Sequence, residues 1–190
     1  QMCRPVFENA EKAFIRAEAL RHPYLYSQGY CDMVVPNSVS LGKRRLIDDD
    51  YAMQHEEGDY DVMVLTGPNM GGKSTLLRQT CLAVIMAQVG CYVPATSCSL
   101  SCFDRIFVRA GARDDIVAGQ STFMVELLET GNILDYATRD SLIVLDELGR
   151  GTSTWDGYAI AYAVVQFFCT HIDACVLFST HYHSLVEELK

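Results

Sequence analysis

The chain has 190 residues, and its 15 Lys and Arg against 24 Asp and Glu give a formal net charge of −9. This is the length of one domain, and a composition with 49% hydrophobic and 21% charged residues excludes a mainly disordered chain. The acidic balance supplies no cluster of Lys and Arg for a nucleic-acid phosphate backbone. We therefore expect this chain by itself to bind DNA poorly.

Eight cysteines are present, but no Cys-x-x-Cys pair and no secretory leader accompany them. This favours reduced thiols inside a cell, and Cys81, Cys91, Cys169 and Cys175 lie in apolar runs that predict burial. The spacing of Cys169, His171 and Cys175 resembles part of a zinc site, but a fourth ligand at a compatible distance is missing. We interpret these residues as buried thiols and a surface histidine.

Three prolines divide the first 60 residues into short pieces, and residues 43–61 form a charged stretch whose second half is expected to be a solvent loop. Residues 13–20 suit either a helix or a strand, because their apolar side chains make no clean helical stripe. No apolar run approaches the roughly 18 residues that span a bilayer, so we expect no membrane partner. The first residue, Gln1, indicates a fragment of a longer protein.

From residue 61 onward, strands and helices alternate. Apolar runs predict strands at 62–65, 105–109, 142–145 and 174–179, and helices at 73–89, 122–137 and 155–168. On the helix at 122–137, Phe123, Leu127 and Leu134 are expected to face inward. The alternation predicts an α/β fold with a mostly parallel sheet flanked by helices.

A phosphate-binding pattern lies between the first of these strands and the first helix. Residues 67–74 fit G-x-x-x-x-G-K-[ST], in which glycines let backbone N–H groups surround phosphates and the helix N-terminus adds positive potential. Lys73 is expected to reach the β- and γ-phosphates of ATP, and the Ser74 hydroxyl to bind Mg²⁺. The candidate nucleotide-binding residues here are Gly67, Pro68, Asn69, Met70, Gly71, Gly72, Lys73, Ser74 and Thr75.

Two carboxylates, Asp146 and Glu147, follow the apolar strand at 142–145. At the carboxyl end of a parallel strand, Asp146 would hold Mg²⁺ through a water, and Glu147 would orient and deprotonate the attacking water. Two acids after a strand also begin ordinary solvated loops. The functional interpretation therefore rests on their combination with the phosphate-binding pattern.

Two further candidates complete the predicted site. His181 follows the last strand at the same sheet edge and is expected to sense the γ-phosphate, whereas we assign His183 to the surface. Ser121 opens the helix at 122–137 as an N-cap and potential anion site, although capping alone would explain it. The order of these elements matches that of P-loop NTPases of the ABC-ATPase type.

Several segments together resemble the ATPase domain of the MutS family of DNA mismatch-repair proteins, and other segments resemble its eukaryotic members. The residues that carry the resemblance are 66–75 (TGPNMGGKST), 121–127 (STFMVEL), 146–154 (DELGRGTST), 156–157 (DG) and 179–183 (STHYH). It favours a strand at 14–20, and it implies a β-rich N-terminal part at 1–60 and a P-loop ATPase core at 61–190.

The resemblance also implies a Mg²⁺-dependent ATPase of the nucleus that forms a heterodimer with the second MutS homologue. Two ATPase domains would pack face to face, with residues 149–153 at the interface and Ser121 reaching the partner's nucleotide. Val34 and Val35 take the positions that pack on adenine, with contact area but no π face. Mismatched double-stranded DNA would be bound by domains absent from this chain, and the family's C-terminal helix-turn-helix is absent after Lys190.

Two other classes of function are compatible with parts of the pattern. A transporter or chromosome-structure ATPase of the ABC type would carry a Leu-Ser-Gly-Gly-Gln signature, where residues 117–121 read Val-Ala-Gly-Gln-Ser. The second class is a non-catalytic nucleotide sensor that only mediates dimerisation. The presence of both Lys73 and Glu147 argues against this class.

Overall fold

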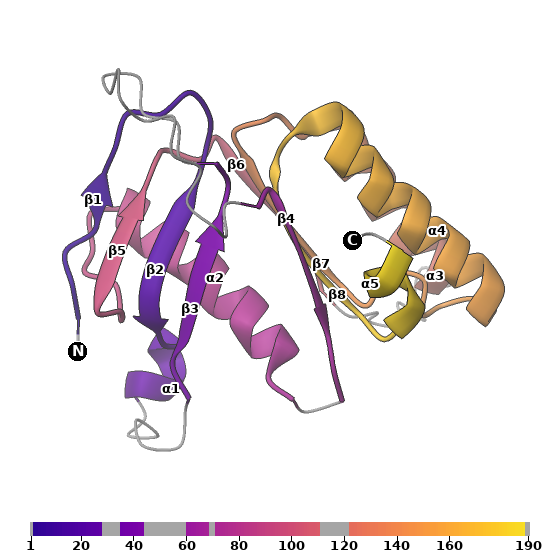
Figure 1. The fold of residues 1–190 in the computed structure, drawn as a ribbon, viewed down its shortest axis with the longest axis horizontal. Coiled ribbons are helices and arrows are strands. Elements are labelled where there is room, and N and C mark those ends of the chain that lie inside the picture. Colours follow the sequence, from indigo (N-terminus) through magenta and orange to yellow (C-terminus); the bar gives the residue numbers. More distant parts are fainter. Residues whose placement is uncertain (1, 28–34, 44–59, 69–70, 111–121, 189–190) are drawn as a thin grey trace.

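A computed structural model describes residues 2–27, 35–43, 60–68, 71–110 and 122–188. Within them, Figure 1 shows two four-stranded sheets with helices between and beside them. The elements in chain order are β1 (Val6–Phe7), β2 (Ile15–Leu20), α1 (Pro23–Ser27), β3 (Asn37–Leu41), β4 (Val62–Thr66), α2 (Lys73–Gln88), β5 (Ser97–Leu100), β6 (Arg105–Ala110), α3 (Thr122–Tyr136), β7 (Ser141–Asp146), α4 (Thr154–Phe167), a π-helical turn η1 (Phe168–Ile172), β8 (Cys175–Thr180) and α5 (His183–Glu188).

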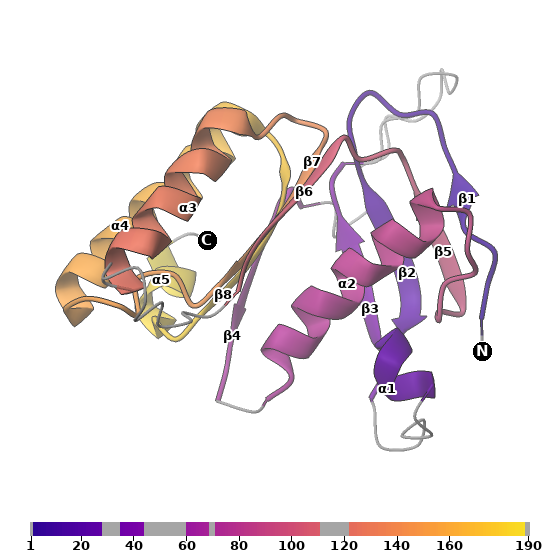
Figure 2. The same ribbon diagram turned by 180° about the vertical axis from the view of Figure 1, so that it is seen from behind.

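One sheet is entirely parallel, in the order β4-β8-β7-β6. Side chains alternate between its faces along β7, so that Leu142 and Val144 join one core cluster while Ile143 and Leu145 join the other. Figure 2 shows α2 on one side of this sheet and α3 and α4 on the other. The sequence prediction of a mostly parallel sheet flanked by helices is confirmed for this sheet.

The second sheet has the order β1-β5-β2-β3, and β2 pairs antiparallel with both of its neighbours. Its strand β2 (Ile15–Leu20) confirms the strand that the resemblance favours for residues 14–20. α2 packs between the two sheets, since it contacts β2 on one side and β7 and β8 on the other. The phosphate-binding pattern therefore begins a helix that is enclosed by both sheets.

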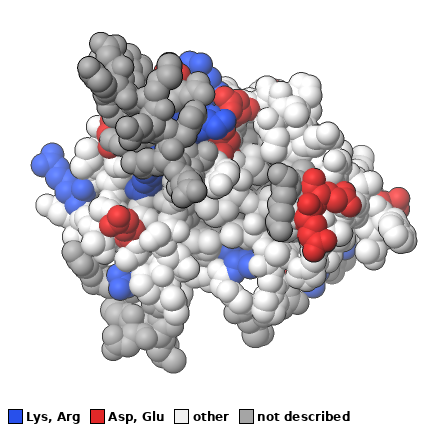
Figure 3. All heavy atoms as spheres, in the orientation of Figure 1, with Lys and Arg blue, Asp and Glu red and all other residues white. Residues whose placement is uncertain are grey.

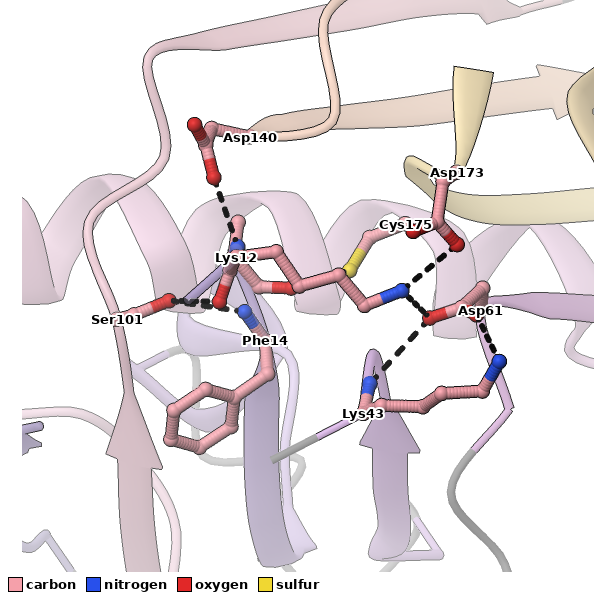
Figure 4. Close-up of polar contacts among 9 residues, drawn as sticks. Lys12, Phe14, Lys43, Asp61, Ser101, Asp140, Asp173 and Cys175 are labelled. Atoms are coloured by element: carbon pink, nitrogen blue, oxygen red, sulfur yellow. Dashed lines mark hydrogen bonds and ion pairs between the residues drawn. The ribbon is translucent and has the colours of Figure 1, made fainter. Parts of the chain in front are cut away.

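A charge cluster around Lys12 ties the two sheets together (Figure 4). Lys12 Nζ donates to Asp61 Oδ1 at 2.5 Å and to Asp173 Oδ1 at 2.9 Å, and Lys43 Nζ lies 3.1 Å from Asp61 Oδ2. Burial opposes charge on Lys12 and on Asp61, but these hydrogen bonds outweigh it, so the pKa of Lys12 is raised and the pKa of Asp61 is lowered. The cluster fixes the start of β2 to β4 and to the turn before β8.

Neighbouring backbone contacts reinforce this junction (Figure 4). The Phe14 N–H donates to Ser101 Oγ at 2.9 Å, and the Ala13 N–H donates to Asp140 Oδ1 at 3.0 Å. The buried thiol of Cys175 donates to the Ala13 carbonyl at 3.1 Å. The junction thus reaches the end of β5, the turn before β7 and the first residue of β8.

The predicted inward face of α3 is only partly right. Phe123, Leu127 and Leu134 are half-buried, and the fully buried positions of this helix are Glu126, Thr130 and Ile133. An acidic side chain takes an inward position because it has a buried cationic partner on β6, which apolar periodicity does not reveal.

The expectation of buried thiols holds for Cys81 and Cys175 but is wrong for Cys91 and Cys169, which are exposed. Cys91 lies just beyond the turn that ends α2, and Cys169 lies on the outer side of η1. Every cysteine in the described ranges is free, and those ranges contain no group of three or more His, Cys, Asp and Glu residues that could hold a metal. None of the described helices is long and apolar enough to cross a membrane.

Candidate functional site

The described part of the loop between β4 and α2 contains two glycines in backbone conformations that favour glycine. Gly67 and Gly72 have φ values of +150° and +87°, which L side chains rarely adopt. The Gly71 N–H donates to the Pro68 carbonyl at 3.1 Å. The predicted residues Asn69 and Met70 lie outside the described residues.

Lys73, the first residue of α2, folds back over this loop. Its Nζ donates to the carbonyls of Gly67 at 2.7 Å and Pro68 at 3.0 Å. These contacts hold the ammonium group against the described part of the loop, and an ammonium group is a good partner for an anion. Ser74 and Thr75 follow in the first helical turn and are half-buried.

Asp146 ends β7 and is buried. Ser179 of β8 donates a hydrogen bond to Asp146 Oδ1, and the strand register places these two residues side by side. Asp146 and Ser74 both line one cavity of about 260 Å³ between α2 and the ends of β6 and β7. Its lining residues are His22, Ser74, Leu77, Arg78, Cys81, Leu82, Val108, Ala110, Val144 and Asp146.

Ser74 carries a hydroxyl and Asp146 a carboxylate, and Mg²⁺ prefers such hard oxygen donors, although the surface of the cavity that both residues line is almost entirely apolar. The donor set of Ser74 and Asp146 therefore fits the metal that the sequence predicts. The structure brings together two residues that lie on different elements and far apart in the sequence.

Glu147 follows directly and has a left-handed φ of +56°. Its N–H donates to the Ser179 carbonyl at 3.0 Å, so the residue leaves the sheet edge in a fixed direction. Its carboxylate is half-buried and pairs with Arg150 Nη1 at 2.5 Å. Any role of Glu147 toward a water molecule therefore competes with this ion pair.

The two histidines after β8 are both exposed. His181 packs on Tyr182, with ring centroids 4.1 Å apart. His183 begins α5, and its Nδ1 lies 2.8 Å from Oγ1 of Thr66, the residue that precedes the phosphate-binding loop. The surface assignment of His183 is confirmed, whereas its contact with Thr66 has no signal in the sequence.

The loop after Glu147 is locked in place by close packing. Gly149 has a φ of +89°, and its carbonyl accepts a hydrogen bond from the buried Tyr182 hydroxyl at 3.1 Å. A Cβ on Gly149 would lie 2.4 Å from the Gly157 carbonyl oxygen of α4. This segment of the predicted dimer interface is therefore packed against α4 and against Tyr182, the residue before α5.

Three further residues are predicted to bind the nucleotide or the partner's nucleotide. Val34 and Ser121 lie outside the described residues. Val35 is described, and it is 75% exposed. Sequence reasoning also misses Ser179 and a buried pair formed by Arg109 and Glu126, because each acts through a partner distant in the sequence.

Comparison with known proteins identifies relatives for this arrangement. Residues 63–190 match the family model of MutS domain V. The chain is 48% identical to the DNA mismatch repair protein Msh6 of Gallus gallus, over 98% of this chain and 14% of the relative. It is 48% identical to MSH7 of Arabidopsis thaliana, over 98% of this chain and 17% of that protein. It is 46% identical to MutS of Geobacillus sp., over 97% of this chain and 19% of that protein.

The chain therefore spans less than one fifth of the length of each of these relatives. The family match covers most of the chain and includes the loop of Lys73 and the carboxylates Asp146 and Glu147. By this match and these identities, the chain belongs to the MutS family.

Proposed function

We propose that this chain is the ATP-binding and ATP-hydrolysing module of a DNA mismatch-repair protein, with the fold of a P-loop NTPase of the ABC-ATPase type. The observation that carries the proposal is the shared cavity of Ser74 and Asp146 beside the loop that Lys73 caps. A hydroxyl, a carboxylate and an ammonium group gathered at the carboxyl ends of parallel strands are the set needed to hold a magnesium nucleotide.

Each residue has a distinct task in this proposal. Lys73 binds the β- and γ-phosphates, and Ser74 and Asp146 hold Mg²⁺, which neutralises phosphate charge when bound. Glu147 orients the attacking water and accepts its proton once its carboxylate is released from Arg150. His181 contacts the γ-phosphate. Residues 67–75 surround the phosphates.

The adenine and the partner subunit engage other parts of the chain. We propose that Val34 and Val35 pack on adenine and that Ser121 reaches the nucleotide of a partner ATPase domain. We propose the second MutS homologue as the partner, because the chain is similar to the eukaryotic relatives Msh6 and MSH7. We also propose a nuclear location for the protein, with residues 1–60 as a β-rich part and 61–190 as the ATPase core.

Mismatched DNA would be bound by parts of the longer protein outside this chain. The chain carries a net charge of −9, and on the face in Figure 3 the blue Lys and Arg side chains of the described residues are dispersed. Such a face offers no continuous footprint for a phosphate backbone. The charge distribution therefore supports a division in which this chain binds the nucleotide and other parts of the longer protein contact DNA.

The test is Mg²⁺-dependent ATP binding and hydrolysis by the chain alone and mixed with the ATPase domain of the second MutS homologue. We expect binding by the chain alone and turnover that requires the mixture. Binding in both samples without turnover in either would favour the alternative, a non-catalytic dimerisation module. Absence of Mg²⁺-dependent binding under both conditions would refute the proposal.

A further inference from the structure

A buried pair of opposite charges lies behind the loop of Asp146 and Glu147. Arg109 on β6 and Glu126 on α3 are 4% and 2% exposed, and Arg109 Nη2 lies 3.5 Å from Glu126 Oε2. The Arg109 Nε also lies 3.7 Å from the carboxylate of the exposed Glu129. Charges removed this far from water persist only where each has partners.

The two members of the pair also hold opposite ends of the same loop. Glu126 Oε1 accepts the Gly149 N–H at 2.6 Å, and Arg109 Nη1 donates to the Asp146 carbonyl at 3.3 Å. The loop backbone from Asp146 to Gly149 is thus fixed at its first and last residues by one ion pair. Because both contacts are to backbone atoms, they hold the path of the chain.

The surroundings leave this loop little room to find another position. Gly151 packs against α3, since a Cβ there would lie 3.2 Å from Glu126 Oε2. The Tyr182 hydroxyl holds the Gly149 carbonyl from the opposite side. Burial, together with the negative charge of Glu126, raises the pKa of Tyr182.

We infer that Arg109 and Glu126 are positioning residues that fix the loop backbone from Asp146 to Gly149 and thereby aim the Asp146 and Glu147 carboxylates. The inference rests on the proposed function. If the loop shifted by up to about one ångström, the Glu147 carboxylate would be misplaced. Such a displacement would lower the rate of hydrolysis by up to about a hundredfold. Nucleotide binding would change little, because it depends on the loop of Lys73 and because Ser179 still holds the Asp146 carboxylate.

The test compares variants of Glu126 with a matched control on the same helix. Glu126→Gln keeps an oxygen that can accept from the Gly149 N–H but removes the charge, whereas Glu126→Ala removes both. Asp135→Asn, on the exposed side of α3, is the control for the loss of one carboxylate charge. Steady-state kinetics are measured in the chain with its partner ATPase domain.

We expect kcat to fall by about tenfold or more in Glu126→Ala, by less in Glu126→Gln, and not in Asp135→Asn. The KM for ATP is expected to stay within threefold of the parent value. A kcat within twofold of the parent in folded Glu126→Ala would overturn the inference.

A double variant, Arg109→Met with Glu126→Ala, guards against misfolding, because it leaves no unpaired buried charge. If the pair positions the loop, the unfolding midpoint recovers in the double variant while kcat stays low. Recovery of both together would mean that the pair serves stability alone and would overturn the inference.

Amide hydrogen exchange of residues 147–151 without nucleotide gives a reading that is independent of ATP chemistry. Exchange faster in the Glu126 variants than in Asp135→Asn supports the inference, and equal exchange contradicts it. If the parent neither binds nor hydrolyses ATP, the proposed function fails, and this exchange measurement still decides whether the pair holds the loop.

Discussion

Ser179, near the end of β8, donates a hydrogen bond to Oδ1 of Asp146 at the end of β7, and its carbonyl accepts the Glu147 N–H at 3.0 Å. One residue of a neighbouring strand thus orients the carboxylate assigned to Mg²⁺ and fixes where the next residue leaves the sheet. Both contacts follow from the parallel register that places Asp146 opposite Ser179.

Ser179→Ala is expected to weaken the response to Mg²⁺ rather than abolish it. Loss of the hydroxyl frees one carboxylate oxygen of Asp146, and removal of such a supporting contact typically lowers metal affinity by about tenfold. The measurement is the Mg²⁺ concentration that gives half-maximal ATP hydrolysis. Ser97→Ala, at an exposed position of β5, is the control, and equal Mg²⁺ responses in the two variants would contradict the role of Ser179.

Two glycines in helices are expected to respond oppositely to alanine. Gly131 in α3 has open space where a Cβ would lie, so Gly131→Ala should raise the free energy of unfolding by up to about 1 kcal/mol. A Cβ on Gly157 in α4 would lie 2.2 Å from the Gly149 oxygen and 2.3 Å from the Tyr182 hydroxyl. Gly157→Ala should therefore destabilise by about 1 to 3 kcal/mol.

Urea denaturation of both variants checks this pair of predictions. A Gly157→Ala variant as stable as Gly131→Ala would show that the loop of Gly149 is not held against α4 as described.

The Lys12 and Asp61 contact predicts a loss of stability in acid. The pKa of Asp61 is lower in the folded chain than the value of about 3.9 expected in the unfolded chain. Its contribution to the free energy of unfolding is therefore complete at pH values above about 3.9. It is lost as the pH falls through the folded pKa. Asp61→Asn should lower the free energy of unfolding by about 2 kcal/mol at pH 7 and by less at pH 3.

Thermal unfolding, followed by circular dichroism between pH 3 and pH 7, measures this difference in stability between the parent and Asp61→Asn. Asp135→Asn serves as the control for an exposed carboxylate. If the difference in stability between the parent and Asp61→Asn were the same at every pH in this range, the ion pair could not be its source.

Thiol alkylation should divide the described cysteines by burial. Burial raises the pKa of Cys81 to about 11 and that of Cys98 to about 12, so few thiolates form there at pH 8. Cys91 and Cys102 are exposed. Iodoacetamide under native conditions, followed by peptide mass spectrometry, should modify Cys91 and Cys102 at least about a hundredfold faster than Cys81 and Cys98. Equal rates would contradict the packing of α2 and β5.

The parallel sheet can be predicted from the sequence because its strands are short apolar runs that each precede or follow a helical segment. β7 is the clearest case, since all six of its residues, Ser141–Asp146, are buried. The start of β2 is ambiguous from periodicity alone, because its strand character depends on pairing with β3 and with β5, which lies far along the chain. Local pattern does not contain that information.

At the candidate site, a contiguous sequence motif predicts the residues within the motif. It does not predict residues whose contacts are with elements far away in the sequence. Lys73, Ser74 and Asp146 stand in recognisable spacings, and the last two meet at one cavity. Apolar periodicity on α3 selects the half-buried Phe123 and misses Glu126, because the partner of Glu126 lies on β6. Buried polar partners of this kind become visible only when the fold brings their elements together.

The most direct test of the central claim separates nucleotide binding from hydrolysis in two variants. Lys73→Ala removes the ammonium group that contacts the loop carbonyls of Gly67 and Pro68, and Glu147→Gln removes the carboxylate that we propose as the base. We predict that Lys73→Ala weakens ATP binding by at least about tenfold, whereas Glu147→Gln binds Mg²⁺ and ATP normally but hydrolyses ATP about a hundredfold or more slowly. Equal ATP affinity in Lys73→Ala and the parent, or undiminished hydrolysis by Glu147→Gln, would contradict the account.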